Sequence, residues 1–193
     1  MRAECGIVKN VLVLASQSPR RAEILRQAGI PFVVRAAPVD ETIQSQETPD
    51  AYVRRLAEAK AGAVPADASE IVLGADTTVV VGSEILGKPT DANDARRMLA
   101  LLSGRRHEVM TGICLRQGSE QICDHAITEV WFAPMSAQEI DEYVASGEPM
   151  DKAGAYAVQG AASKFIPRIA GCYFNVVGLP IALVYRHYLK LTR

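Results

Sequence analysis

The stretch HEVMTGICLRQGSEQICDHAITEVWFAPM, residues 107–135, decides the fold class. Two runs rich in β-branched and other apolar residues flank Gly118, and this pattern predicts a long β-hairpin that turns near that glycine. A long antiparallel hairpin in the middle of the chain does not fit a regular repeat of parallel strands and crossover helices. We therefore expect an α/β or mixed α+β fold with an extended mixed sheet.

Helical and extended patterns lie on both sides of the hairpin. Ser18 before Pro19 is a typical helix start, and Ser136 with Glu139 forms a capping box. The patterns predict helices over residues 19–28, 49–64, 92–102, 137–146 and at the C-terminus, and extended segments over residues 11–15, 31–43 and 71–89, the last with a turn at 82–83. Because no low-complexity linker or internal repeat occurs, residues 1–193 are expected to form a single domain, with room for two lobes.

The charge balance argues against a protein that coats nucleic acid. The 193 residues include 21 Lys and Arg against 22 Asp and Glu. Proteins that bind nucleic acid through its phosphates usually carry a basic excess. We therefore expect no nucleic-acid partner.

The cysteines and the N-terminus predict a reduced, cytoplasmic protein. Cys5, Cys114, Cys123 and Cys172 show no C-x-x-C spacing. Cys114 and Cys123 flank the hairpin turn and could face each other, but for a cytoplasmic chain we expect free thiols. Residues 1–10 lack the apolar core of a signal peptide, and no apolar run is long enough to span a membrane.

The segment SQSPRR, residues 16–21, predicts a phosphate site at the start of a helix. Arg20 and Arg21 lie where the helix dipole disfavours cations, so an anionic ligand would explain them. Free backbone N–H groups, the hydroxyls of Ser16 and Ser18 and two guanidinium groups suit phosphate oxygens. The alternative is that both arginines are solvated surface residues. No Walker A or G-x-G-x-x-G motif occurs.

Asp76 lies within the apolar run IVLGADTTVVV, residues 71–81. A carboxylate buried there without a partner would be costly, so it needs a metal, a cation or a hydrogen-bond network. Such an aspartate can act as a general base or bind Mg²⁺. The alternative is a turn-capping aspartate at the end of a strand.

A third unusual segment is DKAGAYAVQG, residues 151–160. Its small residues would let a ligand approach the backbone, and the amide of Gln159 suits the edge of a base. A tight structural loop is the alternative. Lys60, Lys88 and Glu41 carry little weight on their own. The three histidines lack metal spacing, and no serine or cysteine hydrolase motif occurs.

Seven anchors, in this order along the chain, resemble the Maf family of nucleotide pyrophosphatases. They are LASQSPRR, LAEAKA, LGADTTV, LGKP, LSGRRHEVMTG, EPMDKAGAYAVQG and GCYFNVVGLP, between Leu12 and about Leu183. The resemblance implies an inosine-triphosphatase-like fold, with an elongated mixed sheet flanked by helices and two lobes around a cleft. It also implies hydrolysis of a nucleoside triphosphate to the monophosphate and pyrophosphate, with a divalent cation such as Mg²⁺ or Mn²⁺.

The resemblance also implies roles for individual residues. Asp76 corresponds to the proton acceptor, while Arg20, Thr77 and Gln159 occupy the positions linked to substrate choice. The remaining cleft positions comprise expected phosphate ligands, Ser16, Ser18, Arg21, Lys60 and Lys88, and expected metal ligands, Glu41 and Asp76.

The Gln in DKAGAYAVQG resembles the branch that acts on dTTP and UTP, and modified uridine triphosphates are further candidate substrates. Ala157, where Gly is more usual, departs from the pattern and could narrow the pocket. Two alternatives stay open: a non-catalytic nucleotide-binding regulator of cell division, and a pyrophosphatase for deaminated purine triphosphates. A homodimer is expected by analogy alone.

Overall fold

The structure is a computed structural model that describes residues 11–192. The expectations about Cys5 and the first ten residues lie outside the described residues. Within the described range, no helix has the length and apolar character needed to cross a membrane.

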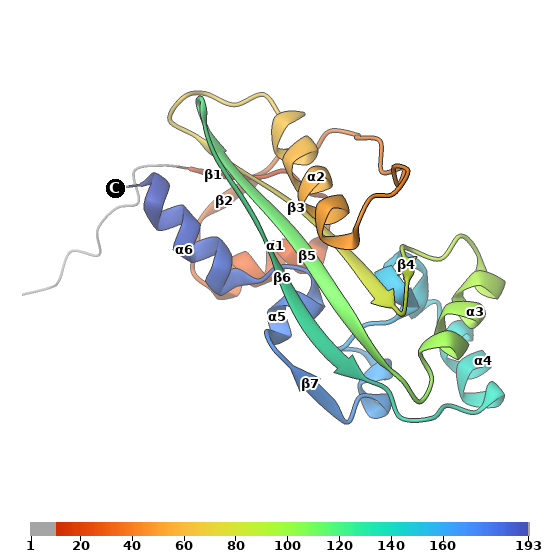
Figure 1. Ribbon diagram of the computed structural model, residues 1–193. Coiled ribbons are helices and arrows are strands. Elements are labelled where there is room, and N and C mark those ends of the chain that lie inside the picture. Colours follow the sequence, from red (N-terminus) through yellow and green to blue (C-terminus); the bar gives the residue numbers. More distant parts are fainter. Residues whose placement is uncertain (1–10, 193) are drawn as a thin grey trace, which may run out of the picture.

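A seven-stranded mixed sheet forms the centre of the molecule (Figure 1). Its strand order is β2-β1-β3-β5-β6-β7, and β4 pairs with β3 beside this path. β1 is parallel to β2 and β3, and the remaining pairs are antiparallel. The strands are β1 (Leu12–Leu14), β2 (Phe32–Val34), β3 (Ile71–Val81), β4 (Glu84–Leu86), β5 (Arg106–Gln117), β6 (Glu120–Trp131) and β7 (Arg168–Ala170).

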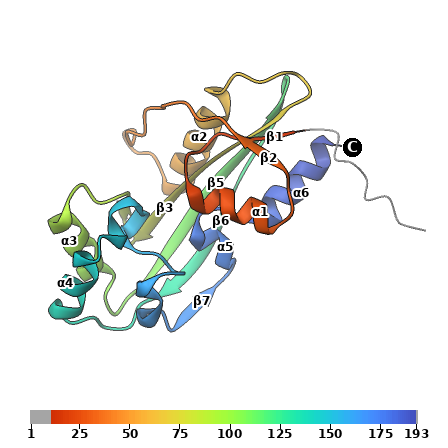
Figure 2. The ribbon, with the colours of Figure 1, turned by 180° about the vertical axis from the view of Figure 1, so that it is seen from behind.

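Helices cover both faces of this sheet (Figures 1 and 2). α2 packs on one face, and α1, α5 and α6 lie on the other. α3 and α4 pack together at the end of the sheet where β3 ends and β5 begins. The helices are α1 (Pro19–Gln27), α2 (Pro49–Gly62), α3 (Ala92–Leu102), α4 (Ala137–Ala145), α5 (Tyr173–Val177) and α6 (Ile181–Leu191). The predicted mixed sheet flanked by helices is thus confirmed.

Most predicted elements occur where the patterns placed them. β5 and β6 form the hairpin, and its last pair, Gln117 with Glu120, encloses the turn at Gly118. Asp91 caps α3 and the capping box of α4 is present. Ser18 occupies the N-cap position of α1, but its side chain makes no capping hydrogen bond. The glycine-rich stretch before β7 forms three short 3₁₀ turns.

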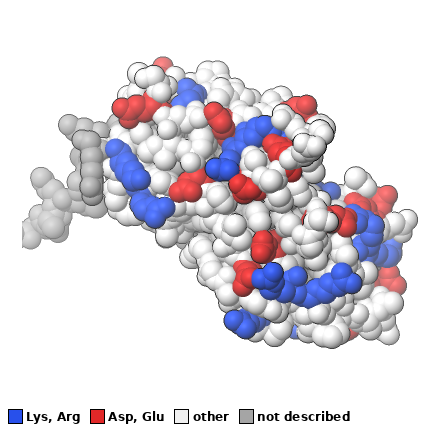
Figure 3. Space-filling view, viewed as in Figure 1, with Lys and Arg blue, Asp and Glu red and all other residues white. Residues whose placement is uncertain are grey.

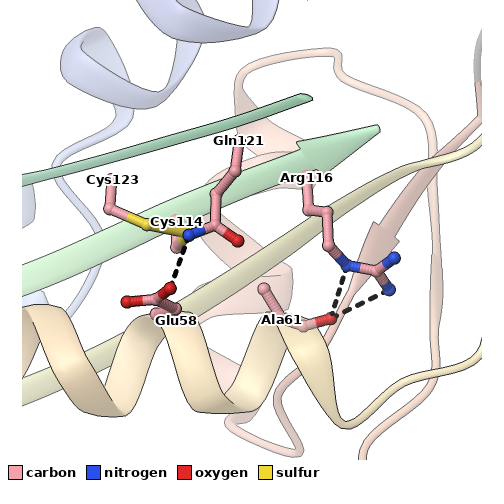
Figure 4. Close-up of a disulfide and its surroundings, with 6 residues drawn as sticks. All are labelled: Glu58, Ala61, Cys114, Arg116, Gln121 and Cys123. Atoms are coloured by element: carbon pink, nitrogen blue, oxygen red, sulfur yellow. Dashed lines mark hydrogen bonds between the residues drawn. A yellow bond between two sulfur atoms is a disulfide. The ribbon is translucent and has the colours of Figure 1, made fainter. Parts of the chain in front are cut away.

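The expectation that all the cysteines are free is wrong for one pair. Cys114 and Cys123 form a disulfide (Figure 4). The hairpin register places them directly opposite each other, with their Cα atoms 4.1 Å apart. Cys172 is free.

α2 lies unusually close to the sheet. A Cβ atom added to Gly74 would lie 2.0 Å from the carbonyl oxygen of Ala57, and one added to Gly112 would lie 2.1 Å from that of Val53. Arg116 on β5 donates to the carbonyl of Ala61 near the C-terminal end of α2 (Figure 4). Backbone contact with two strands therefore fixes the helix that carries Lys60.

Candidate active site

Along one edge of β3, a gap separates its pairing with β1 from its pairing with β4. β1 pairs with β3 only over residues 71–73, and β4 pairs with it only over residues 79–81. Within the described chain, residues 74–78 therefore have a strand partner only on the β5 side. Asp76 and Thr77 lie in this gap, on opposite faces of the strand.

A cavity of about 520 Å³ occupies this gap. The loop after β1, the start of α1, α2, β3, the segment after β4 and the 3₁₀ turns all contribute to it. All ten residues singled out from the sequence line this one cavity: Ser16, Ser18, Arg20, Arg21, Glu41, Lys60, Asp76, Thr77, Lys88 and Gln159.

Lys60 lies between the two carboxylates of the cavity. Its Nζ is 2.6 Å from Oδ1 of Asp76 and 2.6 Å from Oε1 of Glu41. Burial favours a higher pKa for Glu41, but the hydrogen bond and charge of Lys60 outweigh it, so the pKa of Glu41 lies below its ordinary value. The ammonium group thus links the buried carboxylate of Asp76 to the exposed carboxylate of Glu41 and favours the ionised form of Glu41.

Arg21 is the most buried cation of the cavity lining, with 8% of its surface exposed. Its guanidinium donates to the carbonyl of Gly178 at 2.9 Å, to Oγ of Ser16 at 2.9 Å and to Oγ1 of Thr77 at 3.1 Å. Burial lowers its pKa. Three of its five N–H donors hold the cavity wall together, and two are left for an anion.

Arg20 reaches across the cavity to Asp151, a residue to which the sequence pattern assigns no role. Its Nη1 is 2.7 Å from Oδ2 of Asp151, and Lys152 bonds the other oxygen of that carboxylate. Burial would raise the pKa of Asp151, but the hydrogen bonds from Lys152 and Arg20 dominate and lower it to about 2. The charged pair Asp151-Lys152 at the start of DKAGAYAVQG was a sequence signal for the residue, but not for its pairing with Arg20.

The hydroxyl of Thr77 forms hydrogen bonds within the protein and does not point to an unpartnered position in the cavity. Its Oγ1 accepts from Arg21, lies 2.9 Å from Oγ1 of Thr111 and contacts the carbonyl of Gly178. By contrast, the exposed side chains of Lys88 and Gln159 make no hydrogen bond to any other described side chain or backbone group. These two groups are therefore available to a ligand.

Glu41 and Asp76 are the two carboxylates of the cavity that could hold a divalent cation. The described residues contain no cluster of three or more His, Cys, Asp or Glu side chains able to hold a metal, but Glu41 and Asp76 share one cationic neighbour. Mg²⁺ is commonly held by one or two carboxylates together with substrate phosphates.

Cationic side chains line this cavity around the buried carboxylate of Asp76 and the exposed carboxylate of Glu41, a charge arrangement of the kind that enzymes use on phosphate anhydrides. A family model described as Maf-like protein matches residues 11–191, and the chain belongs to the Maf family.

Relatives named dTTP/UTP pyrophosphatase cover most of the chain. The protein of Anaeromyxobacter dehalogenans (strain 2CP-C) is 54% identical over 175 residues, which are 89% of each chain. That of Symbiobacterium thermophilum is 54% identical over 88% of each chain, and that of Bacillus cereus (strain B4264) is 48% identical over 91% of this chain and 92% of its own. Among solved structures, the Staphylococcus aureus Ham1 protein is 15% identical with a TM-score of 0.47, over 64% of this chain and 72% of its own.

Proposed function

We propose that this protein hydrolyses dTTP and UTP to the nucleoside monophosphate and pyrophosphate. The observation that carries the proposal is the single cavity in which Asp76, bound to Lys60, lies among the other cations. The names of relatives about 50% identical to the chain support the substrate assignment.

Asp76 is the proposed general base. A water oxygen attacks the α-phosphorus, and the bond from that phosphorus to the α,β-bridging oxygen breaks. Pyrophosphate leaves, and the water proton goes to the Asp76 carboxylate. Lys60 binds Oδ1 of Asp76, which leaves Oδ2 to accept the proton.

The cations of the cavity would neutralise the triphosphate, which carries about four negative charges. Arg20, Lys60 and Lys88 are the proposed ligands of the phosphates, together with the two free donors of Arg21. Glu41 and Asp76 would hold a divalent cation, which supplies further charge neutralisation when bound.

Gln159 is the proposed reader of the base. Its amide can accept from the N3–H of uracil or thymine and donate to an adjacent carbonyl, whereas cytosine reverses part of that pattern. A mismatched bidentate contact costs about 1–3 kcal/mol, so UTP should be preferred over CTP by roughly 10- to 100-fold. A Gln159→Glu variant that keeps this ratio would contradict the assignment.

Pyrophosphate release tests the function directly. Wild type, Asp76→Asn and the surface control Asp141→Asn are compared with Mg²⁺ or Mn²⁺ on dTTP, UTP, CTP, GTP, 7-methyl-GTP and ITP. We expect turnover of dTTP and UTP that is lost in Asp76→Asn and kept in the control. Binding without turnover would favour a regulatory binding protein, and preference for ITP would favour a pyrophosphatase for deaminated purines.

A further inference from the structure

The backbone on both sides of Gln159 is held by one hydrogen-bonded pair outside the predicted site. Tyr143 comes from α4 and Glu148 from the 3₁₀ turn Glu148–Asp151. The Tyr143 hydroxyl donates to Oε1 of Glu148 at 2.8 Å. Neither residue lines the cavity.

Each member of the pair holds one end of the segment 157–161. The backbone N–H of Ala157 donates to the Tyr143 hydroxyl at 3.2 Å. The backbone N–H of Ala161 donates to both carboxylate oxygens of Glu148, each at 3.2 Å. The five-residue segment with Gln159 at its centre is therefore fixed at both ends.

Gly160 makes the second anchor possible. A Cβ atom at this position would lie 2.2 Å from Oε1 of Glu148, so the carboxylate occupies the space of a side chain. The hydrogen bond between Tyr143 and Glu148 is also shielded from solvent on the tyrosine side, because Tyr143 is only 4% exposed. Burial, and after it the hydrogen bond to Glu148, raises the pKa of the Tyr143 hydroxyl, which keeps the donating proton in place.

The side chain of Gln159 itself has no hydrogen-bond partner among the described residues. The position of the backbone at Gln159 therefore decides from where the amide can enter the cavity. We infer that Tyr143 and Glu148 are positioning residues that aim Gln159 at the base, and that they control the choice between pyrimidine nucleotides. This inference rests on the proposed function.

The test measures the ratio of kcat/KM for UTP to that for CTP. This ratio does not depend on the fraction of active protein, so a purely structural loss leaves it unchanged. In Tyr143→Phe the hydroxyl is absent and the N–H of Ala157 loses its acceptor. We expect the ratio to fall about tenfold, since small displacements of a binding group have effects of this order.

Variants of Glu148 provide a second, independent test of the inference. Glu148→Ala removes the acceptor for Ala161 and should lower the ratio as Tyr143→Phe does, whereas Glu148→Gln retains an acceptor oxygen and should restore part of it. Combining Tyr143→Phe with Gln159→Ala should lower the ratio no further than Gln159→Ala alone, because the first residue acts through the second. Tyr185→Phe and Glu142→Gln, both at exposed positions, are the matched controls.

The outcomes separate the inference from the function. If wild type prefers UTP and Gln159→Ala abolishes that preference while Tyr143→Phe and Glu148→Ala keep it, the inference is overturned and the function stands. If Gln159→Ala also keeps the preference, Gln159 does not read the base and the inference falls with that assignment. If wild type turns over neither dTTP nor UTP, the proposed function fails and the inference fails with it.

Discussion

At the scale of single residues, Lys60 joins the two carboxylates on which the proposed chemistry depends. In Lys60→Met, Glu41 would lose the hydrogen bond and charge that lower its pKa. The pKa of Glu41 should rise, so protonation would begin at a higher pH. We expect kcat/KM for UTP to fall about 100-fold at pH 7 and the acidic limb of its pH profile to move upward.

The measurement is kcat/KM for UTP between pH 4 and 8. Lys190→Met, at an exposed position of α6, is the matched control and should behave as wild type. An unchanged acidic limb in Lys60→Met would mean that Lys60 does not control the ionisation of Glu41.

His107 makes stability depend on pH. It is 2% exposed, and burial lowers its pKa from 6.5 to about 4. Between these values the unfolded chain binds a proton that the folded protein does not, so the free energy of unfolding falls as the pH drops from 6.5 towards 4. The expected contribution is up to about 3 kcal/mol.

Urea unfolding at several pH values checks this prediction. His107→Gln, which can still bond the Tyr156 hydroxyl that lies 2.8 Å from Nε2 of His107, should flatten the dependence between pH 4 and 6.5. His125→Gln, at a half-buried position of β6, should leave it largely intact. Equal slopes in wild type and His107→Gln would contradict the assignment.

The residues of the cavity could be named from the sequence, but their contacts could not. Residue type and motif indicated Arg20, Arg21 and Asp76, and all three line the cavity. The pairing of Arg20 with Asp151, 131 positions apart, depends on tertiary structure. The roles of Tyr143 and Glu148 were missed. A tyrosine on an amphipathic helix resembles an ordinary core residue, and the contact of Glu148 with Tyr143 and Ala161 depends on the folded structure. The catalytic and binding roles stay predictions.

At the scale of elements, local signals and long-range register differ in how far the sequence determines them. Capping residues and a glycine turn predicted α3, α4 and the hairpin because those signals act over a few residues. The disulfide between Cys114 and Cys123 depends on the strand register, and expectations about the compartment outweighed it. The five-residue α5 (Tyr173–Val177) was missed because so short a helix has no clear periodicity.

The close packing of α2 predicts a specific failure in Gly74→Ala. The new Cβ would lie 2.0 Å from the carbonyl oxygen of Ala57 and 2.6 Å from the N of Ala61. Because these are backbone atoms, the helix must move away from β3. We expect a destabilisation of at least about 2 kcal/mol and reduced turnover of UTP, because Lys60 moves with the helix.

Gly62→Ala is the matched control, since nothing lies within 4 Å of a Cβ at this helical position. It should be neutral or stabilise the protein by up to about 1 kcal/mol. Thermal unfolding and UTP turnover of both variants test the argument. Equal stability of the two variants would mean that α2 is not held against the sheet by backbone contact.

At the scale of the whole molecule, two hydrophobic clusters share the same long strands. β3 contributes Leu73 to the cluster under α1 and α6, and Val79 to the cluster under α3 and α4. β5 likewise contributes Ile113 to the first and Val109 to the second. The cavity lies between these clusters, at the gap in β3. On the face seen in Figure 3, basic and acidic side chains lie interspersed.

The shared strands predict that the chain unfolds as one domain. Trp131, the single tryptophan, is the last residue of β6, next to Val130 of the cluster under α3 and α4, and Arg168 of β7 lies over its ring. Its fluorescence therefore reports on that end of the molecule, while far-UV circular dichroism reports on all helices.

Because β3 and β5 cannot leave one cluster intact when the other opens, both signals should give one coincident transition in guanidinium. A saturating non-hydrolysable UTP analogue should shift both midpoints equally. A fluorescence transition that precedes the dichroism transition would show that the two ends unfold separately, and would contradict a single domain.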